Sequence, residues 1–355
     1  MPSLSIWRPP LPNKAQWQAA LRCLASVAIL AATGCKPTPE TAPKSRLVVY
    51  CSVDEAFART VLKLFEDRAR AELDVVFDSE AGKTTGLVNK IIGEAQAGRP
   101  RADVFWSSEL FNTILLGRRG LLEPYDSAAA GDIPARFKDP QHRWTALAAR
   151  ARVLAFNPDQ TPATDIPTRW EQLASPKFAK RTVIANPLFG TTRGHVAAMF
   201  ALWGAKRGRE FLTQLRDNGA HIYDSNSATV RAVIARRAGL GATDTDDVWV
   251  AQRSGASLDL AYPDMGDGGT LLIPCSVAII KGSTNMQAAR NLVDFLVSAE
   301  VERMLAESDS RNIPVRKWLR TELGIESPPE SKVDFNAVAD AMDEAVAAVR
   351  EILIR

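Results

Sequence analysis

The sequence predicts a two-lobed α/β fold in which each lobe is a mostly parallel sheet flanked by helices. The length of 355 residues allows two domains, each with a core large enough to be stable. Short apolar runs typical of buried parallel strands alternate with segments whose apolar residues follow a helical period. Two longer strand-like runs, at 144–156 and 270–280, interrupt this alternation. We expect them to be the two strands that cross between the lobes.

The N-terminal 34 residues have the parts of an export signal. Basic residues extend to Arg22, a short apolar run covers 24–32, and small residues precede a cysteine. The motif Ala-Thr-Gly-Cys at 32–35 is similar to a bacterial lipobox, so we expect lipidation of Cys35. The proline-containing segment 35–45 is then a tether to the membrane surface.

The charge balance argues against a nucleic-acid partner. The formal net charge is +3, and Arg8, Lys14 and Arg22 are the only charged residues of the leader. Removal of residues 1–34 therefore leaves 3 − 3 = 0. A neutral mature chain without a long basic run lacks the electrostatic attraction that phosphate backbones require.

The predicted elements of the first lobe begin with a βαβ unit. Strands are expected at 47–51, 73–77 and 102–106, and helices at 54–70 and around Leu87, Ile91 and Ile92. In the second lobe, strands are expected at 182–185 and 240–243, and helices at 195–203 and from about Asp247 onward. Helices at 285–306 and 335–354 complete the chain, the last with an apolar stripe of Val338, Met342, Ala345 and Val349.

Two cysteines remain in the mature chain besides the lipid site. Cys51 and Cys275 each lie in an apolar strand-like run. Export permits a disulfide between them, but strands separated by another strand lie beyond the roughly 7 Å that a disulfide allows between Cα atoms. We expect two buried thiols, with the disulfide as the alternative.

Several stretches resemble one family. They are LVVYCSVDEAFARTVLKLFE, ADVFWSSELFNTILLGRRGLLEPY, ARARVLAFNP, WEQLASPKFAKRTVIANP, GATDTDD and SVAIIKGSTNMQAARNLVDFLVS. They are similar to the periplasmic iron(III)-type solute-binding proteins of ABC importers, and the resemblance covers nearly all of residues 46–315. It implies a type II periplasmic binding protein fold with the ligand in the cleft between the lobes.

The resemblance also implies a division of the chain. Lobe one is expected to comprise 46–146 and 275–320, and lobe two 147–274. A helical tail is expected at 321–355. Hinge closure around the ligand follows from having only two crossing strands.

Acidic residues follow several of the predicted strands, and ligands of doubly wound sheets lie at the carboxyl ends of strands. They are Asp54, Glu55, Glu80, Glu109, Asp244, Asp246 and Asp247. Clustered carboxylates suit a hard cation or an organic ammonium group. The alternatives are that Asp246 caps the following helix and that the other carboxylates are solvated.

Three predicted helices begin in loops rich in glycine and hydroxyl groups, at 82–85, 190–194 and 225–229. Backbone N–H groups at a helix start attract oxyanions, and Lys83 and Arg193 add positive charge. Ordinary helix capping explains each loop singly.

The resemblance implies ferric iron as the transported ligand, together with an accompanying anion and with no cofactor. Iron-binding members carry two adjacent tyrosines where this chain has Asp246 and Asp247, and often a histidine or tyrosine where it has Asp54 and Glu55. Tyr223 is a candidate phenol ligand. The expected metal ligands are therefore Asp54, Glu55, Asp246, Asp247 and Tyr223. The expected ligand-binding residues are Ser52, Asp54, Glu55, Lys83, Thr84, Ser107, Glu109, Thr191, Thr192, Arg193, Ser225, Asn226, Asp246 and Asp247.

No catalytic motif accompanies these residues. The chain has neither GxSxG nor HExxH, and Gly82-Lys83-Thr84 lacks the earlier glycine of a phosphate-binding loop. We therefore expect a monomeric, non-enzymatic binding protein whose partners are the ligand, an ABC permease and, through its lipid, the membrane. A zwitterion or organic cation such as an aminophosphonate is the alternative ligand, and an exported hydrolase or a ligand sensor is the alternative function.

Overall fold

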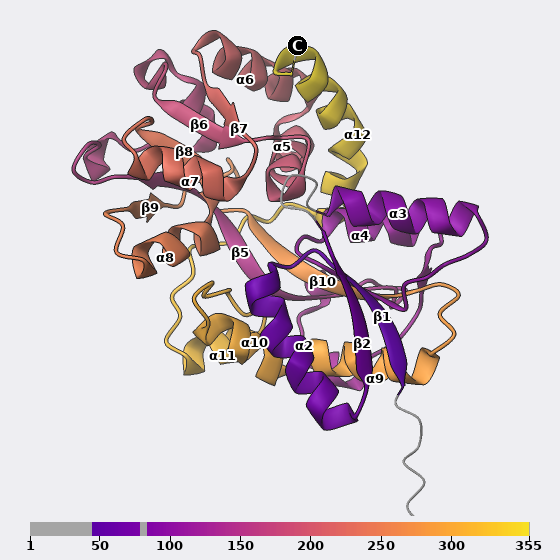
Figure 1. Cartoon of the computed structure of the whole chain (residues 1–355). Coiled ribbons are helices and arrows are strands. Elements are labelled where there is room, and N and C mark those ends of the chain that lie inside the picture. Colours follow the sequence, from indigo (N-terminus) through magenta and orange to yellow (C-terminus); the bar gives the residue numbers. More distant parts are fainter. Residues whose placement is uncertain (1–44, 79–83, 355) are drawn as a thin grey trace, which may run out of the picture. The chain divides into compact units, whose positions relative to one another are not determined.

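The computed structural model describes residues 45–78 and 84–354, which form one compact unit. The predicted signal peptide, Cys35 and nearly all of the tether lie outside the described residues, as do Glu80 and Lys83. Strands and helices alternate along the chain, as Figure 1 shows. This alternation is the predicted α/β pattern.

The first part of the sheet is built on a parallel core. Its strands are β1 Arg46–Cys51, β2 Glu72–Phe77, β3 Val104–Ser107, β4 Leu122–Glu123 and β10 Leu272–Ile280. β1 pairs in parallel with β2 and with β3, which confirms the predicted βαβ unit. β10 runs antiparallel to β3 and also pairs with β4. The carboxyl ends of β1 and β3 therefore meet at one edge.

The second part of the sheet follows the order β5-β8-β6-β7, with β9 beside β5. Its strands are β5 Thr145–Phe156, β6 Thr182–Ala185, β7 His221–Tyr223, β8 Leu240–Asp244 and β9 Asp259–Ala261. β6 is parallel to both β7 and β8. The carboxyl ends of these three strands lie together, as a ligand site of an α/β sheet requires.

Strand β5 belongs to both parts of the sheet. Its first half pairs with β10, and its second half pairs with β8 and β9. Every residue of β5 and of β10 is buried. The chain thus enters the second part through β5 and returns through β10, as the sequence predicts for the two crossing strands.

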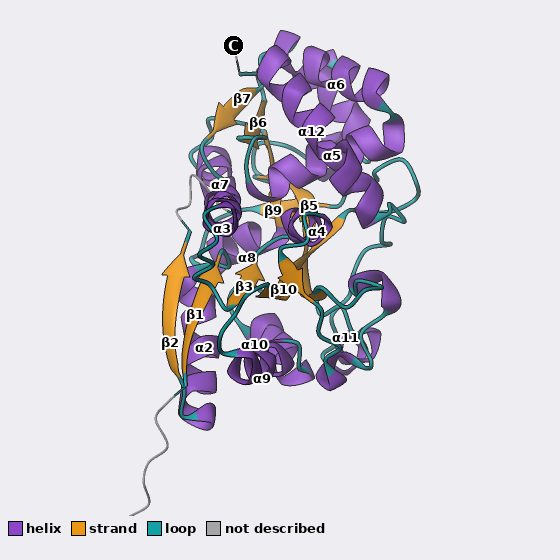
Figure 2. Ribbon diagram, turned by 90° about the vertical axis from the view of Figure 1, so that its right-hand side faces the viewer, coloured by secondary structure: helices purple, strands orange, loops and turns teal. Residues whose placement is uncertain are grey.

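Helices flank the strands in both views of the fold, as Figures 1 and 2 show. Those around the first part are α2 Glu55–Ala69, α3 Thr85–Gln96, α4 Phe111–Arg118, α9 Met286–Leu296, α10 Ala299–Glu307 and α11 Lys317–Glu322. Those around the second part are α5 Gly190–Trp203, α6 Ala205–Asp217, α7 Asn226–Ile234 and α8 Thr245–Arg253. The helices α5, α7 and α8 each begin directly after a strand of the second part or a short loop that follows one.

The single helix predicted at 285–306 is wrong. The structure has two helices there, α9 and α10, because Ser298 adopts an extended backbone with φ −70° and ψ 154°. Its hydroxyl oxygen accepts a hydrogen bond from the backbone N–H of Val301, as a helix N-cap does. The helical period of the apolar residues continues through the break, so the sequence pattern does not show where the first helix ends.

The C-terminal helix α12, Phe335–Ile352, has the predicted apolar stripe, and all four of its residues are buried. The helix packs against α5 and α6 of the second part and against α4 of the first. The ring of Phe335 lies 6.0 Å from that of Phe111, and Asp340 forms an ion pair with Arg118. The predicted tail therefore contacts elements of both expected lobes.

Both remaining cysteines, Cys51 and Cys275, are buried and free. Burial raises the pKa of each thiol well above its usual range. This confirms the interpretation of two buried thiols.

We expect Gly269→Ala to lower the free energy of unfolding by about 1–3 kcal/mol. A Cβ atom at Gly269 would lie 2.3 Å from the backbone carbonyl carbon of Glu330, and backbone cannot move aside cheaply. The matched control is Gly93→Ala on α3, where nothing lies within 4 Å and alanine is the better helix former. Urea denaturation checks this; equal stability of the two variants would contradict the close approach at Gly269.

Candidate functional site

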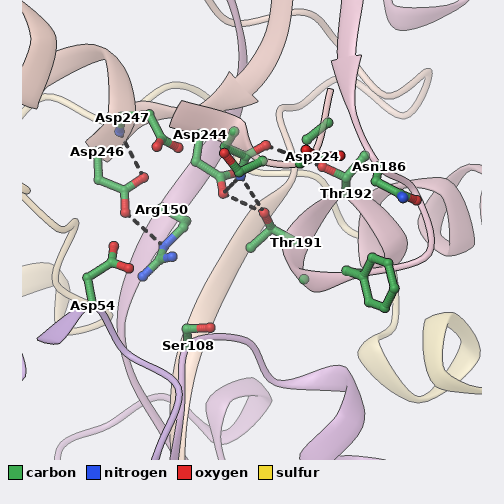
Figure 3. Close-up of a pocket in the computed structure, with 15 residues that line it drawn as sticks. Asp54, Ser108, Arg150, Asn186, Thr191, Thr192, Asp224, Asp244, Asp246 and Asp247 are labelled. Atoms are coloured by element: carbon green, nitrogen blue, oxygen red, sulfur yellow. Dashed lines mark hydrogen bonds and ion pairs between the residues drawn. The ribbon is translucent and has the colours of Figure 1, made fainter. Parts of the chain in front are cut away.

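A polar pocket lies where the carboxyl ends of the strands meet the starts of the helices. Figure 3 shows the residues that line it. They come from the residues just after β1, β3, β6, β7 and β8, from the middle of β5, and from the first turns of α5, α7 and α8. The lining residues are Asp54, Ser108, Arg150, Ala185, Asn186, Phe189, Gly190, Thr191, Thr192, Asp224, Ser225, Asn226, Asp244, Asp246 and Asp247.

A buried ion pair between Arg152 and Asp244 forms the back of the pocket. The side chains are 0% and 1% exposed, and Arg152 Nη1 lies 2.8 Å from Asp244 Oδ1. The other carboxylate oxygen of Asp244 accepts hydrogen bonds from Thr191 Oγ1 at 2.5 Å and from Asn226 Nδ2 at 2.8 Å. One carboxylate at the end of β8 thereby ties together β5 and the starts of α5 and α7.

His195 supports this ion pair from behind. Arg152 Nε donates a hydrogen bond to His195 Nδ1 at 3.3 Å, and the imidazole packs edge-on to Trp170 with ring centroids 4.2 Å apart. Burial, with the nearby Arg152 charge, holds the pKa of His195 well below 6.5. The neutral ring accepts at Nδ1 and carries its proton on Nε2, so it orients Arg152 and does not face the pocket as a ligand.

A second arginine on β5, Arg150, lies in the pocket itself. Its Nε lies 3.4 Å from Asp246 Oδ2, and both side chains are under 10% exposed, at 6% and 7%. Its Nη2 lies 3.6 Å from the sulfur of Cys275. Burial alone would lower the pKa of Arg150, but the carboxylate of Asp246 and other negative groups outweigh it and raise the pKa. Arg150 is therefore fully charged.

Five carboxylates line the pocket. They are Asp54, Asp224, Asp244, Asp246 and Asp247. Among the residues that the structure describes, Arg150 in the lining and Arg152 behind it lie next to these carboxylates. Carboxylate oxygens of Asp244, Asp246 and Asp247 also lie within 4.8 Å of one another, close enough to bind one metal ion.

Hydroxyl and amide groups line the part of the pocket next to Asp244. Thr191 and Thr192 belong to the first turn of α5, and Asn226 is the first residue of α7. Ser225 is the N-cap of α7, where its hydroxyl oxygen accepts a hydrogen bond from the N–H of Ala228 at 3.1 Å. The positive ends of two helix dipoles therefore face the carboxylates, and an oxyanion bound there would be stabilised by them.

Seven of the expected ligand-binding residues line the pocket, and so does Asp244, one of the acidic residues that follow the predicted strands. The seven are Asp54, Thr191, Thr192, Ser225, Asn226, Asp246 and Asp247. The helix-cap alternative for Asp246 does not apply, since the N-cap of α8 is Asp244 and Asp246 lies in the first turn. The capping alternative does describe Ser225, whose hydroxyl is engaged with the helix backbone.

Ser52 and Thr84 lie beneath the pocket, bonded to a residue that lines it. The hydroxyl of Thr84 lies 3.1 Å from those of Ser52 and Ser108. All three residues are buried, and only Ser108 is part of the pocket lining. Ser52 and Thr84 therefore position Ser108.

Other proposed residues lie outside the pocket. Glu55 is exposed and forms an ion pair with Arg59 one helical turn away. Glu109 is fully buried, and its carboxylate accepts the N–H of Phe111 at 2.8 Å, so it serves the start of α4. Burial raises the pKa of Glu109. Ser107 donates its hydroxyl hydrogen to the carbonyl of Glu109 at 2.6 Å.

Arg193 and Tyr223 also lie away from the lining. Arg193 Nη1 donates to Asn112 Oδ1 at 3.2 Å, so it joins α5 to α4. Tyr223 ends β7 without lining the pocket, and none of the described lining residues is a tyrosine or a histidine. The described part of the site therefore offers oxygen ligands from carboxylates, hydroxyls and amides.

The sequence reasoning missed four polar lining residues: Ser108, Arg150, Asn186 and Asp224. Asn186 and Asp224 directly follow β6 and β7, so the strand-end rule would have found them. Arg150 interrupts an apolar strand-like run, and a charge inside a buried strand must have a partner. That signal was present in the sequence, although it did not identify Asp246 as the partner.

Comparisons with known proteins agree with this architecture. Residues 100–339 match the family described as bacterial extracellular solute-binding protein. A probable ABC transporter periplasmic-binding protein of Sinorhizobium fredii is 28% identical over 234 residues, covering 62% of this chain and 64% of that protein. The major ferric iron-binding protein of Neisseria meningitidis is 26% identical over 288 residues, covering 78% and 82%.

Solved structures show the same fold. The crystal structure of iron-bound HitA from Pseudomonas aeruginosa has a TM-score of 0.76 at 22% identity, covering 87% of this chain and 99% of that one. The type II periplasmic binding protein fold predicted from the sequence is thereby confirmed.

We expect the stability of the protein to fall as the pH drops below about 6.5, through the burial of neutral His195. The unfolded chain binds a proton at this histidine below 6.5, whereas the native state does not until a much lower pH. The free energy of unfolding therefore falls by up to about 1.4 kcal/mol per pH unit in this window. His195→Gln should remove this part of the slope, while His221→Gln, at an exposed histidine, should keep it. Denaturant titrations between pH 5 and 8 measure both, and equal slopes in the two variants would contradict the assignment.

Proposed function

The chain belongs to the bacterial extracellular solute-binding proteins, which are non-enzymatic ligand-capturing components of ABC importers, and we propose that its ligand is ferric iron bound with a small anion. The observation that carries this proposal is the group of carboxylates from Asp244, Asp246 and Asp247, whose oxygens lie within 4.8 Å of one another. A hard cation prefers such oxygen ligands. Five carboxylates in the pocket lining favour a highly charged cation.

A buried cluster of like charges needs compensation. Several carboxylates in one pocket repel one another and lose hydration, which costs several kcal/mol unless positive charge lies among them. Asp244 already has Arg152 as its partner. It therefore contributes negative charge to the pocket, but its oxygens are less available to bind a cation directly. Asp246 and Asp247, at the start of α8, are the nearer candidates for direct ligation, with Asp54 approaching from the other side.

The starts of α5 and α7 form the proposed binding site for the anion. Thr191, Thr192 and Asn226 line the pocket at these helix starts, and free N–H groups of a helix start bind oxyanions. An anion there would fill the coordination positions that aspartates leave open and would offset part of the ferric charge. Two relatives carry names consistent with this ligand: the major ferric iron-binding protein of Neisseria meningitidis and iron uptake protein A1 of Synechocystis.

A zwitterion or an organic cation such as an aminophosphonate is a second candidate ligand. It is favoured by the absence of tyrosine among the described lining residues, since phenolate oxygens bind ferric iron more firmly than carboxylates do. The ammonium group would lie against Asp54, Asp246 and Asp247, and the phosphonate against Thr191 and Thr192. Elemental analysis and mass spectrometry of protein isolated with its natural ligand distinguish the two candidates.

We further propose that the protein is an exported, monomeric lipoprotein anchored through Cys35. The support is the signal-like leader and the Gly34-Cys35 junction in the sequence. Among the described residues, no helix is both long and apolar enough to cross a bilayer. A lipid anchor would keep the protein near its permease.

We expect the double variant Asp246→Asn, Asp247→Asn to bind ferric iron more weakly, by about 1–3 kcal/mol for each hydrogen-bonded charge removed. The melting temperature of the ligand-free protein should fall, since Asp246→Asn removes the carboxylate partner of the buried Arg150. Glu55→Gln is the matched control, because Glu55 is an exposed carboxylate next in sequence to Asp54 but outside the pocket. Competition titration against citrate measures the affinity. Undiminished affinity in the double variant would rule out these aspartates as the cation site.

We expect Cys35→Ala to release the protein from the membrane fraction and to abolish labelling with a lipid precursor, because the thiol is the only attachment point proposed. Fractionation of cells that produce each form, with palmitate labelling, checks this. Labelling that survives the substitution would show that the anchor lies elsewhere.

A further inference from the structure

Arg150 lies in the middle of β5, between groups that come from three other elements. Its side chain is 6% exposed. Asp246 of α8 lies on one side, with Arg150 Nε 3.4 Å from Asp246 Oδ2, and the sulfur of Cys275 on β10 lies 3.6 Å from Nη2. Asp54, which precedes α2, also points its carboxylate toward the guanidinium group, as Figure 3 shows. The two carboxylates come from opposite walls of the pocket.

The two arginines of β5 are held very differently. Arg152 donates to Asp244 at 2.8 Å and to His195 and Thr191 at 3.3 Å, so a network of hydrogen bonds fixes it. For Arg150, the Nε–H makes no hydrogen bond within the described residues, and Nη2 faces a thiol, which is a weak acceptor. Arg150 is thus held mainly by charge, and it can move without breaking a network.

We propose that Arg150 is a built-in competitor for the cation subsite: its guanidinium group occupies the place between Asp54 and Asp246 that the ligand cation takes, and the ligand must displace it. This proposal rests on the cationic ligand proposed above. In the ligand-free protein, Arg150 compensates the facing carboxylates, so the acidic pocket does not need a bound ion to be stable.

Such a competitor makes the site selective for charge. A monovalent cation gains no more from Asp54 and Asp246 than the tethered guanidinium already does, and it is opposed by the repulsion of Arg150. A trivalent cation gains far more from the same carboxylates and can displace the arginine. Arg150 therefore excludes abundant ions such as sodium while leaving the pocket open to a hard, multiply charged ligand.

The alternative role for Arg150 is to bind the anionic part of the ligand. The two roles predict opposite effects of removing its charge, because loss of a competitor strengthens cation binding and loss of an anion partner weakens it. Arg150→Gln removes the charge, and Arg150→Lys keeps it. Arg59→Gln is the control, since Arg59 is exposed and pairs with Glu55 outside the pocket.

Binding of terbium(III), a hard trivalent ion followed by its luminescence, and of ferric iron in competition with citrate test the proposal. Arg150→Gln should lower the Kd for terbium at least tenfold at low sodium concentration and should increase the dependence of that Kd on sodium concentration, because sodium can enter the pocket of this variant and compete. Arg150→Lys and Arg59→Gln should stay within threefold of the unmodified protein. Should Arg150→Gln fail to fold, Arg150→Met removes the same charge.

The two proposals fail in distinguishable ways. Weaker or unchanged terbium binding in a folded Arg150→Gln variant overturns the competitor role, whatever the behaviour of ferric iron. If terbium binding strengthens as expected but the unmodified protein binds no ferric iron, the iron assignment is wrong and the competitor role stands.

Discussion

The buried ion pair between Arg152 and Asp244 is the interaction on which the rest of the site depends. Taking both charges out of water is costly, and the cost is offset by the attraction between the two charges and by the hydrogen bonds that each of them makes. Here Asp244 accepts from Arg152, Thr191 and Asn226, and Arg152 also donates to His195. Satisfying this one carboxylate requires that the end of β8 and the starts of α5 and α7 lie against β5. The geometry of the pocket follows from that requirement.

Strand β5 gives the pocket its position between the two parts of the sheet. Residues two apart on a strand point to the same face, so Arg150 and Arg152 emerge side by side. Arg152 lies where β5 pairs with β8, and Arg150 lies where it pairs with β10. The same strand therefore carries one arginine in each part of the sheet. The carboxylates that lie next to these two arginines come from β8, from α8 and from the segment before α2.

The pocket combines carboxylates with helix starts. The carboxylates attract positive charge, and the starts of α5 and α7 attract negative charge, which suits a cation that carries its own anion or a molecule with both charges. Closure would bring Asp54 toward Asp246 and would increase their repulsion unless a positive group lies between them. Under the proposed function, a bound cation would therefore favour closure, and closure would favour binding of the cation.

Local sequence patterns were enough to predict the order of the strands and helices and the edge of the sheet at which the candidate site lies. Apolar runs and helical periods depend only on residues close in sequence, so β1, β6 and the stripe of α12 were predicted almost to the residue. The rule that ligands lie at carboxyl ends of strands was enough to find Asp54, Thr191 and Asp246.

The residues at the strand ends that face one another could be identified from the tertiary structure alone. Glu55 and Asp54 are neighbours in the sequence, yet the first turn of α2 turns Glu55 to solvent and Asp54 to the pocket. Glu109 follows a strand as Asp54 does, but it is drawn inward by the N–H groups of α4. Arg150 forms an ion pair with Asp246, which is nearly a hundred residues away in the sequence. Asp246 lies on α8, and the pairing of β5 with β8 brings this helix next to Arg150. Local patterns encode no such distances, because the direction of a side chain at a strand end depends on long-range pairing and on the partners that pairing brings within reach.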